Sequence, residues 1–126
     1  SMRMLARYLP FGITEIHTSD AVRCYETVAP MARSLSLDMI YWSELSEYAY
    51  EKDKKAAINV VNDIIESEAH AIVCGHNPVI PGIVSKFIGK KNFKELDHGL
   101  MPGEAFILHH RDGEVIAIDW MPAPEA

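Results

Sequence analysis

The chain has 126 residues, 18 of them acidic and 12 basic, which gives a formal net charge of −6. This length fits one domain, 1–126, and is enough to bury a hydrophobic core. Lysines gather only in two short stretches, 52–55 and 86–94, so the clustered positive charge typical of nucleic-acid binding is missing. No apolar run reaches the roughly 18 residues that a membrane-spanning helix needs. We therefore expect a cytoplasmic protein that binds neither nucleic acid nor membrane.

The first chemically informative stretch follows a short predicted strand at 13–17. Residues 1–2 resemble a remnant of tag cleavage, and 4–9 resemble the end of a helix. Apolar positions at helical spacing then predict a helix over 20–35, with Ser19 or Asp20 as its N-cap. Arg23 falls in the first turn, where a positive side chain opposes the helix dipole unless an anion is bound.

The middle of the chain predicts a second strand at 37–42 and an amphipathic helix at 54–67. Between them lies an irregular acidic and aromatic segment, 43–51. Two glutamates of this segment, Glu44 and Glu47, are candidates for a general acid. A solvated or helix-capping role remains open for either glutamate.

A third predicted strand at 71–75 leads into Gly75-His76-Asn77-Pro78. Prolines suit the first turn of a helix, which we expect over 78–88, and the free amides of a helix start favour an anion. His76 stands where an open α/β sheet places its ligands. Because Arg23 follows another strand of the same expected sheet, we expect Arg23 and His76 to share one cleft.

The C-terminal part predicts a long surface loop at 90–102, followed by a hairpin. The extent of the loop indicates a rim or a lid near the site. The strands of the hairpin, 106–110 and 114–119, flank Arg111-Asp112-Gly113. Alternating strands and helices predict an α/β fold, with a mostly parallel sheet, helices on both faces and a C-terminal antiparallel hairpin.

The cysteines and the remaining histidines predict no metal site. Cys24 and Cys74 lack the spacing of a zinc site, and we expect reduced, buried thiols. His109 and His110 are neighbours on a strand and should point to opposite faces. We expect His70 to be exposed and His98 to lie in the long loop.

Three segments together resemble the histidine phosphatase superfamily, which has the phosphoglycerate mutase-like fold. They are the run from Ser19 to Thr27, Leu45-Ser46-Glu47, and Gly75-His76-Asn77-Pro78. Residues 14–24 and 106–120 look most like the phosphatase domain attached to some actinobacterial Nudix hydrolases. The resemblance implies phosphoryl transfer through a phosphohistidine, without a metal or another cofactor. It implies catalytic roles for His76 and Glu47, and substrate binding by Arg23, Ser19 and Asn77.

One departure from the family pattern concerns the nucleophile. The family begins with Arg-His-Gly, whose histidine becomes phosphorylated, and no Arg-His-Gly occurs in this sequence. His17 lies inside a predicted strand and is a poor substitute. We therefore expect this chain to lack turnover while it binds a small phosphorylated substrate or a phosphate or sulfate ion.

Two alternatives to an enzyme are a regulatory module that keeps only the anion pocket and an unrelated flavodoxin-like or receiver-like domain. A receiver needs a carboxylate cluster after its first strand, which this sequence does not offer. The family's first strand lies inside the sheet, and we find no counterpart here. We therefore expect a homo-oligomer, or a separate N-terminal fragment, to fill the gap.

Overall fold

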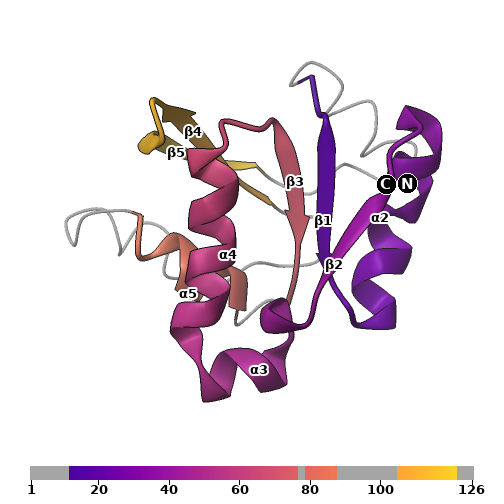
Figure 1. Cartoon of the computed structure of the whole chain (residues 1–126), viewed down its shortest axis with the longest axis horizontal. Helices are drawn as coiled ribbons and strands as arrows, with labels where there is room; N and C mark the ends of the chain where they lie inside the picture. Colours follow the sequence, from indigo (N-terminus) through magenta and orange to yellow (C-terminus); the bar gives the residue numbers. More distant parts are fainter. Residues whose placement is uncertain (1–11, 77–78, 88–104, 122–126) are drawn as a thin grey trace.

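The protein is described from a computed structural model that covers residues 12–76, 79–87 and 105–121. Within these residues there are two sheets (Figure 1). The first is parallel and has the order β2-β1-β3, formed by β1 (Glu15–Ser19), β2 (Met39–Trp42) and β3 (Ala71–Cys74). The second is an antiparallel hairpin of β4 (Ala105–Arg111) and β5 (Glu114–Met121). The predicted α/β class with a C-terminal hairpin is confirmed.

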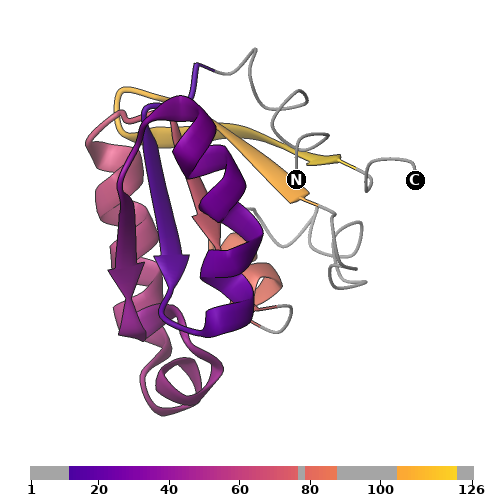
Figure 2. The same cartoon turned by 90° about the vertical axis from the view of Figure 1, so that its right-hand side faces the viewer.

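Helices cover both faces of the parallel sheet. Helix α2 (Val22–Leu35) lies on one face and α4 (Lys54–Glu66) on the other, as Figure 2 shows with α2 in front of the strands and α4 behind them. Two shorter helices, α3 (Glu47–Lys52) and α5 (Val79–Val84), lie toward the end of the sheet where the parallel strands finish (Figure 1). This end of a parallel sheet is where α/β proteins place their ligands.

The two-residue period of the strands separates the core into two clusters. Ile16 of β1 is fully buried and packs with Val28 and Met31 of α2. On the opposite face, Trp42 and Val73 pack against the cluster that α4 forms with Leu45 and α5. The central strand β1 is therefore held from both sides, which fixes the point at which its chain leaves the sheet.

Several predicted boundaries are wrong in detail. β1 ends at Ser19, two residues later than expected, because its pairing with β2 continues to Ser19 opposite Trp42. Neither Ser19 nor Asp20 is the N-cap of α2; that residue is Ala21, which makes no capping bond through its side chain. The Ser19 hydroxyl instead accepts a hydrogen bond from the Ala21 amide at 3.2 Å, one residue before the helix.

The segment expected to be irregular, 43–51, is largely helical. A short 3-10 helix, η2 (Ser43–Leu45), leads into α3, whose N-cap Ser46 accepts a hydrogen bond from the Ala49 amide at 3.1 Å. A serine followed directly by a glutamate, as in Ser46-Glu47, is an ordinary N-terminal helix signal. The expected helix over 78–88 is described only as α5, followed by turns at 85–87.

Some predictions fall on residues outside the described ranges, namely the helix remnant at 4–9, Asn77, His98 and the loop at 90–102. His70 is exposed, as expected. The helices of the described ranges include none that is both long and apolar enough to span a membrane.

Candidate active site

The site lies where the chain leaves β1 and β3. These neighbouring strands run parallel with Thr18 opposite Cys74, so their carboxyl ends meet at one edge of the sheet. Arg23 is the second residue of α2, and His76 follows β3 by two residues. The topology thus brings two residues that are 53 positions apart in sequence to one place.

The side chains of Arg23, Glu47 and His76 are in mutual contact. The Arg23 Nη2 lies 2.8 Å from Glu47 Oε1 and 3.1 Å from His76 Nδ1. Glu47 Oε1 and His76 Nδ1 are 3.4 Å apart. The expected approach of Arg23 to His76 is confirmed, and a carboxylate from α3 joins the pair.

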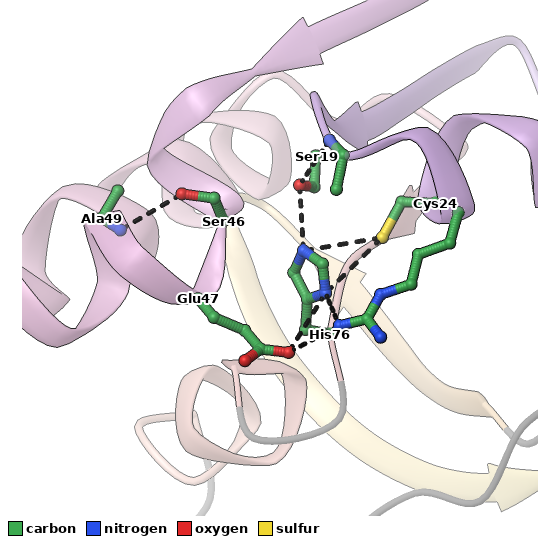
Figure 3. A network of polar contacts seen from close by, with 8 residues as sticks. Ser19, Cys24, Ser46, Glu47, Ala49 and His76 are labelled. Carbon is green, nitrogen blue, oxygen red and sulfur yellow. Dashed lines mark hydrogen bonds and ion pairs between the residues drawn. The ribbon is translucent and has the colours of Figure 1, made fainter.

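The other ring nitrogen of His76 faces the protein interior (Figure 3). Its Nε2 lies 3.2 Å from the hydroxyl oxygen of Ser19, a fully buried residue. Guanidinium nitrogens can only donate hydrogen bonds, so in the neutral ring Nδ1 accepts from Arg23. Nε2 then carries the hydrogen and donates it to Ser19. The ring is thus held at both ends in one orientation.

Burial lowers the pKa of His76, because the charged imidazolium loses solvation in its enclosed position. The negative charges of Glu47 and Asp20 act against this effect, and the positive charge of Arg23 adds to it. His76 is therefore mainly uncharged at neutral pH. An anion placed beside Nδ1 would favour the charged ring.

Arg23 and Glu47 form the solvent-exposed side of the cluster. The Arg23 side chain is 73% exposed and that of Glu47 46%, against 5% for His76. A ligand of this cluster would therefore enter from this side. The Glu47 carboxylate already contacts both nitrogens that an anionic ligand would use.

The two glutamates proposed as general acids differ in position. Glu47 is the first residue of α3, where the Ser46 cap orients it toward the cluster (Figure 3). Glu44 accepts a hydrogen bond from Ser43 at 3.0 Å, and no described contact joins it to Arg23 or His76. The geometry favours Glu47 over Glu44.

Cys24 is the site residue that sequence reasoning missed. Its sulfur lies 3.7 Å from Nε2 and 3.9 Å from Nδ1 of His76. A hydrogen bond from Cys74 lowers the pKa of Cys24 to about 7, aided by the charge of Arg23 and a hydrogen bond from Ser19, while desolvation acts in the other direction. The sequence feature that could have identified Cys24 is its position directly after Arg23. Both cysteines are free thiols, as expected, although Cys74 is only partly buried.

His17, the weak substitute for a nucleophile, is occupied by structural contacts. It is buried in β1, with Nε2 2.9 Å from Glu15 Oε1. Its Nδ1 accepts a hydrogen bond from the Trp42 indole at 2.9 Å, and the two rings stack. A histidine bonded at both nitrogens has no free nitrogen to attack a phosphorus atom.

Comparisons with known proteins agree with this arrangement. The family model of the histidine phosphatase superfamily (branch 1) matches residues 2–57, a stretch that contains Ser19, Arg23 and Glu47. An 8-oxo-(d)GTP phosphatase of Mycolicibacterium smegmatis is 29% identical over 124 residues, which are 97% of this chain and 38% of that protein. The chain thus spans about two fifths of the length of this relative. In sequence, the chain is therefore similar to the histidine phosphatase superfamily over residues 2–57.

Proposed function

We propose that this domain binds the phosphoryl group of a small phosphorylated substrate at Arg23 and His76, within a phosphohistidine type of phosphoryl transfer. The observation that carries the proposal is the contact of Arg23, His76 and Glu47 at the edge of the sheet where the parallel strands end. An exposed arginine beside a buried histidine matches the needs of a doubly charged oxyanion.

Each side chain has a role that follows from its chemistry. The planar fork of Arg23 suits two phosphoryl oxygens. His76 donates from Nδ1 to an oxygen on which negative charge increases, once that charge has favoured its protonation. Glu47, beside both groups, protonates the leaving oxygen. Ser19 positions His76 through Nε2 and, because it is fully buried, reaches the substrate only through that ring.

The sequence contains no Arg-His-Gly, and His17 is bonded at both nitrogens. We therefore propose that the 126-residue chain by itself binds the anion without turnover. The second candidate function, a non-catalytic phosphate-binding or regulatory module, rests on the same observation. The two differ in whether a nucleophile is supplied by another polypeptide segment.

The printed name of the relative, 8-oxo-(d)GTP phosphatase, supports a nucleotide-derived phosphate as substrate. The proposed association with a Nudix-type domain rests only on the resemblance of residues 14–24 and 106–120. Two free thiols support a cytoplasmic location. These assignments belong to the proposal.

The binding proposal is tested by Arg23→Gln. Removing the exposed guanidinium deletes a charge-assisted contact of about 1.5–3 kcal/mol, so sulfate affinity should fall roughly tenfold or more. Arg33→Gln is the matched control, because Arg33 lies in the last turn of the same helix. The affinity of this variant for sulfate should equal that of the parent chain. Isothermal titration calorimetry with sulfate measures both. Equal affinities in Arg23→Gln and the parent chain would contradict the proposed site.

A second experiment concerns the carboxylate that occupies the site. Glu47→Gln removes the negative charge that competes for Arg23 and His76. Because this ion pair is partly exposed, we expect sulfate to bind only about two- to fivefold more tightly. Glu44→Gln, which changes a glutamate bonded to Ser43, should have no effect. Weaker sulfate binding in Glu47→Gln would show that the carboxylate supports the site instead of competing for it.

The titration of His76 provides a third prediction. Without ligand its pKa should lie below the ordinary value of about 6.5. Bound sulfate favours the imidazolium, so the pKa of His76 should rise. By linkage, sulfate should bind more tightly as pH falls from the pKa of the bound state toward the pKa of the free chain, below which the gain ends. NMR of the imidazole signals measures this, with His109 as an internal control. An unchanged or lowered His76 pKa in saturating sulfate would exclude direct contact with the anion.

The absence of turnover is the fourth prediction. With p-nitrophenyl phosphate, the chain should release product no faster than its His76→Ala variant and the buffer blank, because the sequence contains no Arg-His-Gly and His17 is bonded at both ring nitrogens. A phosphatase assay over the neutral pH range measures this. Turnover that disappears in His76→Ala would mean that another residue of this chain serves as the nucleophile.

A further inference from the structure

The two cysteines of the chain meet beneath the anion site. Cys24 is in the first turn of α2 and Cys74 is the last residue of β3. The Cys74 thiol donates a hydrogen bond to the Cys24 carbonyl oxygen at 3.5 Å, so the two cysteines are in direct contact. The pairing is built by the fold, because Cys74 packs into the cluster that α2 forms against β1.

The surroundings of the two thiols differ. Cys24 lies beside the His76 ring, and the positive charge of Arg23 and a hydrogen bond from Ser19 favour its thiolate, while the negative charge of Glu47 acts against it. The hydrogen bond to Cys24 raises the pKa of Cys74, and burial and the negative charge of the Cys24 thiolate raise it further. One sulfur is therefore prepared to attack, and its neighbour is kept protonated until the first has reacted.

We propose that Cys24 and Cys74 are a peroxide-oxidisable thiol pair beside the anion site, with Cys24 as the attacking thiolate and Cys74 as the resolving thiol. This inference does not require that the site binds phosphate. It adds a modification site that the phosphoryl-transfer proposal does not use.

The reaction needs one equivalent of a hydroperoxide. The Cys24 thiolate attacks one oxygen of hydrogen peroxide, an S–O bond forms, the O–O bond breaks, and the departing hydroxide takes a proton to become water. The product is a neutral sulfenic acid, so the Cys24 thiolate no longer raises the pKa of Cys74. The Cys74 sulfur then attacks the Cys24 sulfur, an S–S bond forms, and hydroxide leaves with the Cys74 proton as a second water. Two thiols lose two electrons, and the peroxide gains them.

Burial restricts the oxidant. Cys24 is only 4% exposed, but it touches the ring whose Nδ1 faces the open side of the site. Hydrogen peroxide is the smallest hydroperoxide and is therefore the probe of choice.

The test uses the folded 126-residue chain treated with hydrogen peroxide and analysed by intact mass and peptide mapping. We expect the chain to become lighter by two hydrogens, to show a Cys24–Cys74 link and to regain both thiols in dithiothreitol. Cys74→Ser should stop at a sulfenic acid on Cys24, trapped by dimedone. In Cys24→Ser the remaining Cys74 should react at least about tenfold more slowly, since it lacks the stabilised thiolate.

The variants also guard against a folding artefact. Serine is close in size to cysteine, and circular dichroism should show the same helix content in all three proteins. Unreacted thiols under conditions that oxidise glutathione would overturn the proposal. So would disulfides formed only between chains, or equal reaction rates of the two single variants.

Discussion

The orientation of one buried imidazole decides what this site can do. His76 is held by Ser19 through Nε2 and by Arg23 through Nδ1, so the ring cannot turn without losing a bond on each side. Taking the Nε2 hydrogen of the buried His76 ring away from its Ser19 acceptor would cost about 1–3 kcal/mol. Four segments of the chain, the end of β1, the start of α2, the start of α3 and the turn after β3, are fixed relative to one another by these contacts.

The same contacts set a constraint on charge. Four ionisable groups lie close together where the parallel strands end. They are the arginine, the carboxylate, the histidine and a thiol of lowered pKa. Without ligand the Glu47 carboxylate balances Arg23. Under the proposed function, a dianion that enters would give the cluster an excess of negative charge, and protonation of His76 would reduce it. The charge of the ligand would thus create a donor that phosphoryl transfer needs.

Periodic patterns and strand topology can be predicted from this sequence, whereas features that depend on where a helix starts cannot. The strands and long helices follow from hydrophobic period, and the meeting of Arg23 with His76 follows from the rule that parallel strands end at one edge. The choice between Glu47 and Glu44 does not follow, because it depends on a helix start at Ser46 that places one glutamate inward and leaves the other with Ser43. The N-cap of α2 was also predicted wrongly, since Ser19 is used to hold Ala21 and His76 instead.

Cys24 shows the limit most clearly. In sequence it is one apolar position of a helix, and its role appears only when β3 brings Cys74 and His76 against it. If both proposals hold, Arg23 would act on two neighbours at once, holding an anion on its exposed side and favouring the Cys24 thiolate on the other. A bound anion would then offset the positive charge that favours the thiolate, so occupancy of the site and oxidation of the thiol pair would oppose each other. By thermodynamic reciprocity the Cys24 thiolate would also weaken anion binding, and one guanidinium would couple the two proposed properties of the site.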